Sequence, residues 1–225
     1  MAKKLRRSNL SVDAYDFVRD LFINGSRYNP GDKISVEELS RELGVSRTPL
    51  WGAINRLEAE GIVEIVPRQG VYLINFDPRR ALEIYTVREV LEGMAARLAA
   101  EKVTDRQLAT LRAKVEEQRA HSESGDVEGY YMAALEFHEQ IARIADNKTL
   151  EHHLMAVLAQ IRAMRLQHKY VPLNLKNSRE DHTKLLRAII ARDPVAAEQE
   201  ARSHIRELAA ELSNATVTET ARRLA

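Results

Sequence analysis

Hydrophobic residues near the start of the chain recur at the spacing of short amphipathic helices. Between Ser11 and Asn24 they stand three or four positions apart, which predicts one helix, and Gly25 ends it. A second helix is predicted over Glu37–Leu43, because Ser35 precedes it in the pattern of a capping box and Gly44 follows it as a left-handed cap. Two short helices are therefore expected to open the chain.

The next segment predicts a longer helix followed by two short β runs. The helix starts at Ser46 and ends at Gly61, with Pro49 in its first turn, where a missing N–H costs little. The runs IVEIV and VYLI flank the turn PRQG, which predicts a β-hairpin. Helix, tight turn, helix and hairpin in this order predict a winged helix-turn-helix domain over residues 1–76. The alternative is a small α+β domain without a nucleic-acid role.

From Asp77 to the C-terminus the hydrophobic pattern has the period of helices and contains no run typical of a strand. Asp77 suits a helix cap and Pro78 a first helical residue. We expect a mainly α protein, with an all-α antiparallel bundle over residues 77–225 and a tail over 213–225 that is frayed or forms a short extra turn. The predicted helices cover about 78–102, 105–121, 126–145, 149–168, 178–192 and 194–213.

The composition narrows the class of protein only in part. The chain has 225 residues, 44% of them hydrophobic and 30% charged, which is ordinary for a globular protein. It contains no cysteine, and no apolar run approaches the roughly 20 residues of a membrane span. We therefore expect a cytoplasmic protein without a membrane partner. The formal net charge is +1, so any case for nucleic acid rests on where the charges lie.

Several motifs carry a resemblance to a known family. GVSRTP, then RLEAEGIV and RQGVYL, resembles the DNA-binding domain of GntR-family bacterial transcription regulators. YTVREVLEGMAARLAA, EFHEQIARIADNKTL and EDHTKLLRAIIARDPVAAEQEARSHI resemble the helical FCD domain of the FadR-like subgroup. The resemblance implies a homodimer that binds a palindromic operator. It also implies that a small carboxylate or sugar acid in the helical domain changes the affinity for DNA.

The third predicted helix separates an apolar side from a side that faces DNA. The apolar stripe consists of Leu50, Ala53, Ile54 and Leu57. The opposite side carries Thr48, Trp51, Gly52 and Asn55. The resemblance implies that Arg47, at the N-terminal end, is the main base reader, and its two-pronged guanidinium suits guanine. The alternative is that Arg47 caps the helix or pairs locally.

Further side chains complete the predicted DNA-binding set. Around the third helix it comprises Ser46, Arg47, Thr48, Trp51 and Asn55, with Arg41 before them and Arg68, Gln69 and Gly70 at the wing tip. Lys3, Lys4, Arg6 and Arg7 are predicted to form a phosphate-binding arm. Trp51-Gly52 departs from the family, whose usual residues here are Arg-Glu. Trp51 either packs on thymine methyls or deoxyribose, or packs back onto the wing or the first helix.

Arg88 stands in the apolar register of its predicted helix, together with Ile84, Tyr85 and Leu91. An arginine aimed at a core needs an anion, because it does not deprotonate. That anion is either an internal partner such as Glu92 or the carboxylate of an effector, and the third alternative is that Arg88 reaches the surface. Arg162, and less clearly Arg165, also follow an apolar stripe and are further candidates to line the pocket.

Three histidines occupy apolar registers on three predicted helices: His138, His182 and His204. Three such imidazoles suit a divalent metal such as Zn²⁺ or Ni²⁺, and the resemblance implies that these positions are metal ligands in metal-binding members of the family. Those members add an aspartate one turn before the first histidine, where this chain has Ala134. The three histidines then either hold a metal whose shell water or the effector completes, or bind the effector directly without metal.

These patterns leave three classes of function. The first is an effector-responsive DNA-binding transcription regulator, acting as a repressor and not as an enzyme. The second is a metal-dependent enzyme that uses the three histidines, although no Asp or Glu is clearly placed as a general base. The third is an architectural DNA-binding protein. A purely structural bundle would carry Leu in place of Arg88 and the histidines, so the first class is favoured.

Overall fold

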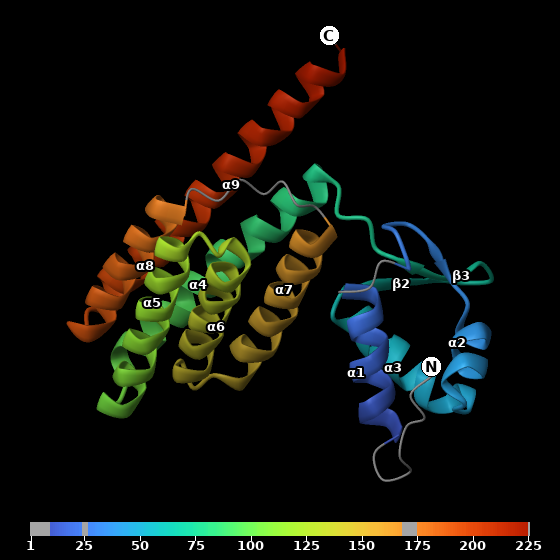
Figure 1. Ribbon diagram of the computed structural model, residues 1–225. Coiled ribbons are helices and arrows are strands. Elements are labelled where there is room, and N and C mark those ends of the chain that lie inside the picture. The colour runs from blue at the N-terminus through green and yellow to red at the C-terminus, as the bar shows by residue number, and fades with distance from the viewer. Residues whose placement is uncertain (1–9, 24–26, 168–174, 225) are drawn as a thin grey trace. The chain divides into compact units, whose positions relative to one another are not determined.

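The computed structural model describes residues 10–23, 27–167 and 175–224. The chain divides into two compact units, Met1–Asp77 with Ala159–Lys169 and Pro78–Leu158 with Tyr170–Ala225. Figure 1 shows the helices and strands of each unit. Each of the two predicted domains was continuous in sequence. The grouping of Ala159–Lys169 with the first unit was therefore not predicted. Among the described helices, none is long and apolar enough to cross a bilayer.

The first unit has the order of elements that the sequence predicted. Its helices are α1 (Leu10–Ile23), α2 (Val36–Leu43) and α3 (Arg47–Ala59), and its strands are β1 (Lys33–Ile34), β2 (Val63–Val66) and β3 (Gly70–Leu73). The strands form an antiparallel sheet in the order β1-β3-β2. Strand β1 was not predicted, because two residues are too few to show the alternation of a strand.

Local signals explain where α2 begins and ends. The Ser35 hydroxyl accepts a hydrogen bond from the backbone N–H of Glu38 at 3.2 Å, which satisfies one of the free N–H groups of the first turn. Gly44 ends the helix with φ 64°, in the left-handed region that favours glycine. The tight turn between α2 and α3 thus rests on residues that the sequence identifies.

The apolar side of α3 forms the core of the first unit. Its predicted stripe is buried: Leu50, Ala53, Ile54 and Leu57 are each at most 2% exposed. Helix α3 packs against α1 and contacts β2, and Val18 of α1 is fully buried. Burial of a Leu or Ile side chain stabilises the fold by roughly 1.5–3 kcal/mol. This packing fixes which side of α3 faces outward.

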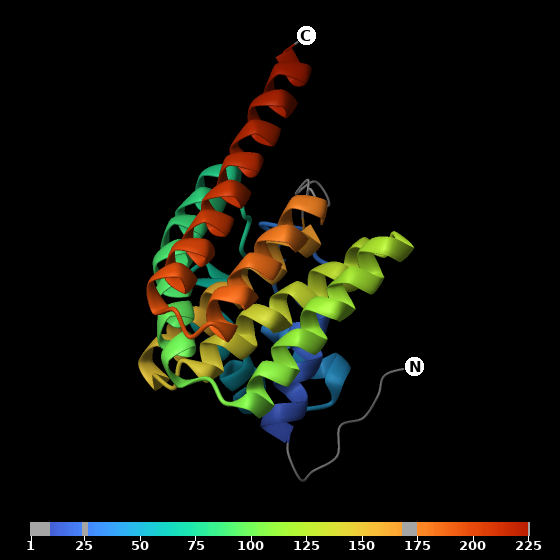
Figure 2. The ribbon, with the colours of Figure 1, turned by 90° about the vertical axis from the view of Figure 1, so that its left-hand side faces the viewer.

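The second unit is built from helices α4 (Pro78–Lys102), α5 (Asp105–Ser124), α6 (Val127–Ile144), α7 (Lys148–Gln167), α8 (Leu175–Ile190) and α9 (Pro194–Leu224). Helix α4 packs along α9, and α5 packs along α6. Figure 2 shows α9, in red, beside α4, in green. Part of α7, from Ala159, is grouped with the first unit. The helices agree with the predicted bundle apart from their ends.

The predicted tail over residues 213–225 was wrong. Helix α9 continues without a break to Leu224, and in Figures 1 and 2 its C-terminal end projects beyond the other helices of its unit. The segment SNATVTETARRL contains no Gly or Pro, and its Ala, Glu and Arg residues favour helix. Nothing in that sequence stops a helix that already packs on α4.

Candidate functional site

One surface of α3 presents the side chains predicted to meet DNA. Ser46, Arg47, Thr48, Trp51 and Asn55 are all exposed, opposite the buried stripe of the helix. Ser46 occupies the N-cap position, and its side chain makes no capping hydrogen bond there. The first turn of α3 therefore offers a hydroxyl and backbone N–H groups to a phosphate.

Arg47 forms an ion pair with Glu37 of α2, with 3.0 Å between Nη2 and Oε1. This is the local pairing that the sequence left as the alternative to base reading. Both side chains are more than 60% exposed. An exposed pair of this kind contributes at most about 1 kcal/mol, so it does not prevent Arg47 from moving to a DNA base.

Trp51 is a large apolar side chain with 39% of its surface exposed. The exposure agrees better with the first alternative, contact with DNA, than with an indole packed back onto the unit. The neighbouring Gly52 has open space around it, since an added Cβ would meet no heavy atom within 4 Å. No steric constraint therefore explains why α3 carries glycine at this position.

The wing tip joins β2 to β3 and carries the other predicted DNA contacts. Arg68 and Gln69 are exposed, and Arg68 adopts φ 65°, an uncommon left-handed conformation for a non-glycine residue. Gly70, with φ 130°, follows directly. Arg41 is exposed on α2. The predicted arm of Lys3, Lys4, Arg6 and Arg7 lies outside the described residues.

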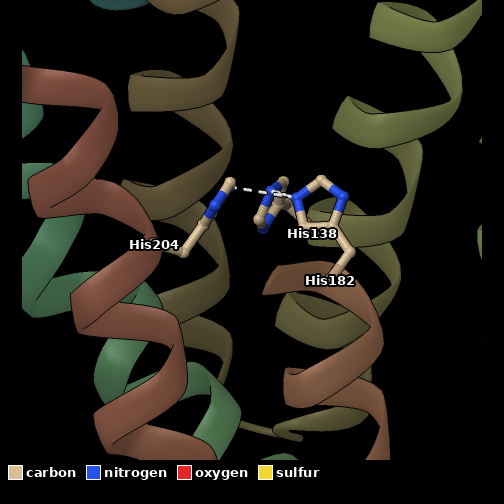
Figure 3. A group of neighbouring side chains, drawn as sticks. All are labelled: His138, His182 and His204. Atoms are coloured by element: carbon tan, nitrogen blue, oxygen red, sulfur yellow. Dashed lines mark hydrogen bonds between the residues drawn. The ribbon is translucent and has the colours of Figure 1, made fainter. Parts of the chain in front are cut away.

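The three predicted histidines come together inside the second unit. His138 of α6, His182 of α8 and His204 of α9 are each at most 3% exposed. His182 Nε2 lies 3.1 Å from His138 Nε2 and 3.0 Å from His204 Nε2. Figure 3 shows the three rings turned toward one another. Ligand atoms of the three rings all lie within 4.8 Å of one another, close enough to hold one metal ion.

Burial keeps two of these imidazoles in the form that binds metal. Desolvation lowers the pKa of His204 to about 4, although Asp181 acts in the opposite direction. Desolvation also lowers the pKa of His182 well below its ordinary value, with a further contribution from His204 and His138. Both rings are therefore neutral at pH 7, and a neutral imidazole is the metal-binding form.

Arg88 forms an ion pair with Glu92, the internal partner that the sequence analysis gave as one alternative. Its Nε lies 2.6 Å from Glu92 Oε1, one turn along α4, and both side chains are 4% exposed. Burial acts to raise the pKa of Glu92, but Arg88 and His138 overcome this and lower it to about 2. Glu92 is therefore an anion held between Arg88 and His138. Arg88 and the histidine group belong to one connected polar cluster.

A small cavity opens beside this cluster, with room for about one water molecule. Its lining includes Arg88, all three histidines and Ala134, together with Tyr85, Tyr130, Tyr131, Leu135, Ser178 and Leu208. The methyl group of Ala134 thus leaves free space next to the imidazoles, where a longer side chain would otherwise reach. Arg162 is not in this lining and belongs to Ala159–Lys169 of the first unit, as does Arg165.

The structure adds polar residues that the sequence did not single out. Gln118 of α5 is fully buried, and its Oε1 lies 2.6 Å from His182 Nδ1. Asp181 of α8 lies 3.5 Å from His204 Nδ1. A signal for Gln118 exists in the sequence, because it follows Leu111 by seven residues and so occupies an apolar helical register. Asp181 has no such signal.

Comparison with known proteins finds a DNA-binding domain followed by a helical domain, as in the structure. Residues 10–73 match the model of bacterial regulatory proteins of the gntR family, and residues 83–207 match the FCD domain. The Nta operon transcriptional regulator of Aminobacter aminovorans is 34% identical over 140 residues, which are 61% of this chain and 65% of that protein. The HTH-type transcriptional repressor RspR of Escherichia coli is 27% identical over 183 residues, 80% of this chain and 78% of that one.

Among solved structures, Escherichia coli McbR/YncC superposes with a TM-score of 0.74 at 24% identity, covering 91% of this chain and 97% of that one. This likeness supports the fold. The relatives are transcriptional regulators, so the alternative of a metal-dependent enzyme is not supported. With an outward-facing α3 and wing in one unit and an FCD bundle in the other, the chain belongs to the GntR family of bacterial transcriptional regulators.

Proposed function

We propose that this regulator is an effector-responsive repressor that binds operator DNA as a homodimer. The effector is a small organic acid, either a carboxylate or a sugar acid, bound in the second unit. The observation that carries the proposal is the cavity that Arg88 and the three histidines line together. A buried arginine and a group of convergent imidazoles stabilise a bundle less well than leucines do, but they suit an anionic ligand.

A divalent ion such as Zn²⁺ or Ni²⁺ fits the same residues. His138, His182 and His204 would hold it, and two nitrogens on a tetrahedral zinc stand about 3.3 Å apart, close to the 3.0 and 3.1 Å found here. Bound there, the ion supplies positive charge that attracts a carboxylate. Ala134 contributes no ligand atom, so a coordination position remains for water or for the effector.

The size of the cavity indicates how effector binding and DNA binding are linked. An organic acid is larger than the present cavity, so its entry must displace side chains on α4, α6, α8 or α9. Helix α4 carries Arg88 and begins at Pro78, directly after the first unit. A shift of α4 is therefore a physical route from effector to DNA-binding unit. The two binding energies are then coupled reciprocally.

The homodimer and the repressor role have separate support. Val87, Val90 and Met94 of α4 are 40–52% exposed and lie three or four residues apart, so they form an apolar row on one face of the helix. A second copy of the chain is the partner that would cover this row in a regulator of a palindromic operator. Escherichia coli RspR, a relative over 80% of the chain, is named a repressor.

Fluorescence anisotropy with a labelled duplex from the promoter region of the protein's own gene tests DNA binding. We expect this duplex to bind more tightly than a random duplex of equal length at physiological salt, and equal affinities would exclude operator recognition. Elemental analysis of protein purified without chelator or metal-affinity tag tests the ion. Protein that contains no metal and does not take up Zn²⁺ or Ni²⁺ would favour direct binding of the effector by the imidazoles.

A further inference from the structure

Each of the three histidines has a polar side chain behind it, on the ring nitrogen that faces away from the other rings. His138 Nδ1 lies 2.7 Å from Glu92 Oε2, and His182 Nδ1 lies 2.6 Å from Gln118 Oε1. His204 Nδ1 lies 3.5 Å from Asp181 Oδ2, a longer contact. These three acceptors come from three different helices, α4, α5 and α8. Every ring therefore has an acceptor beside its outer nitrogen, and the inner nitrogens face one another.

The Gln118 amide determines the tautomer of His182. Its nitrogen donates to the backbone carbonyl of Ala133 at 3.4 Å, which leaves Oε1 facing His182 Nδ1. An amide oxygen only accepts, so Nδ1 must carry the proton and Nε2 must carry the lone pair. Gln118 is fully buried, and water does not compete for this contact. His182 is thus held as the Nδ1–H tautomer.

The carboxylates of Glu92 and Asp181 favour the same tautomer on the other two rings. Glu92 pairs with the Arg88 guanidinium at 2.6 Å, so its carboxylate presents an acceptor oxygen to His138 Nδ1. The contact between His138 Nδ1 and Glu92 Oε2 is 2.7 Å long and does not have the alignment of a full hydrogen bond. Asp181, which also binds Lys184 at 3.0 Å, faces His204 Nδ1. All three Nε2 atoms then direct lone pairs inward.

Three inward lone pairs at these distances favour a bound cation. If every ring carries its proton on Nδ1, the Nε2 atoms 3.0 and 3.1 Å apart are acceptors without donors, and they repel one another. A metal ion bound to all three nitrogens removes this repulsion. The outer acceptors also increase the basicity of the rings and fix their orientation.

Building on the metal site of the proposed function, we propose that Glu92, Gln118 and Asp181 are positioning residues that commit the three imidazoles to coordinate a divalent metal through Nε2. Glu92 and Asp181 also place two negative charges just outside an all-imidazole ligand set. Ala134 supplies no negative charge to offset the charge of the metal ion, so this negative charge comes from Glu92 and Asp181. Gln118 makes the shortest of the three contacts to an outer ring nitrogen and carries no charge. A neutral substitution there therefore tests the positioning role without changing the charge of the site.

The test compares Gln118→Leu with Gln118→Glu in the full chain. Leucine has a similar size but no acceptor, so His182 loses the partner that holds its tautomer. We expect the Zn²⁺ dissociation constant, measured by competition with a chromophoric chelator, to rise about 10–100-fold. Glutamate restores an acceptor, and we expect its affinity to stay close to that of the wild type. Leu111→Val, in the buried core of α5, is the matched control for a packing change that leaves His182 untouched.

Nitrogen-15 NMR of the imidazoles in the zinc-loaded wild type gives an independent readout. We expect protonated Nδ1 and metal-bound Nε2 on all three rings. Metal-bound Nδ1, or equal zinc affinity in Gln118→Leu and the wild type, would overturn the positioning role and leave the metal site intact. A wild type that binds neither Zn²⁺ nor Ni²⁺ would overturn the metal site itself. Circular dichroism before each titration establishes that the variants are folded.

Discussion

Replacement of Trp51 by arginine tests how α3 meets DNA. Trp51 is exposed on the side of α3 opposite the buried stripe, so a new guanidinium there would lie beside a docked phosphate backbone. Each added phosphate contact steepens the dependence of log affinity on log salt by about 0.9. Between about 50 and 200 mM salt, the variant should therefore lose roughly 3-fold more affinity than the wild type for each DNA-binding unit, and roughly 10-fold more for a dimer.

The assay is fluorescence anisotropy of Trp51→Arg and wild type with a random duplex at four salt concentrations. We expect tighter binding at low salt and a steeper slope for the variant. Val195→Arg adds the same charge at the start of α9 in the second unit and should leave the slope close to that of the wild type. An unchanged slope in Trp51→Arg would show that this side of α3 does not face the phosphates, and it would refute the assignment of the DNA-binding surface.

Four further predictions concern DNA reading, helix stability, pH and assembly. Arg47→Ala should weaken operator binding by about 1–3 kcal/mol and leave random-duplex binding less affected; equal losses on both duplexes would mean that Arg47 contacts only phosphate. Gly52→Ala should raise the free energy of unfolding in urea by roughly 1 kcal/mol, because the site is helical and has room for a Cβ; a destabilised variant would contradict the open space there. Metal-free protein should lose stability as the pH falls from 6.5 toward 4, because the unfolded chain protonates His204 before the folded chain does. His204 contributes about 3 kcal/mol of this loss, so the pH profile of His204→Gln should be shallower by about that amount, and identical profiles would argue against it. Val90→Glu places a charge in the apolar row of α4 and should shift sedimentation from dimer toward monomer; a dimer of unchanged strength would place the interface elsewhere.

The sequence predicted the parts of the fold that local signals determine. Ser35 and Gly44 mark the two ends of α2, and the apolar stripe of α3 is buried as its spacing required. Strand β1 was missed, because its two residues are defined by their pairing with Val71 and Tyr72 of β3. Pairing between distant segments is a property of the folded chain, and no short pattern encodes it.

The candidate site, like the fold, was predicted only where local sequence patterns determine it. Histidines in apolar registers indicated a buried group, and the structure places their rings together. The sequence also left the partner of Arg88 open between Glu92 and an effector, and the folded chain pairs Arg88 with Glu92. Gln118 was not identified, because its role depends on how α5 and α8 pack. A single polar side chain in a helix does not reveal which ring it will face.

The proposed regulator depends on a ligand site in the second unit that controls the affinity of the chain for DNA. The most direct measurement is the dissociation constant of zinc-loaded protein for its own promoter duplex, with and without each organic acid that calorimetry shows to bind. We predict that a binding acid changes this constant by about 5–150-fold, and that the duplex changes the affinity for that acid by the same factor. If acids bind the protein and leave its affinity for the promoter duplex unchanged, the ligand site does not control DNA binding.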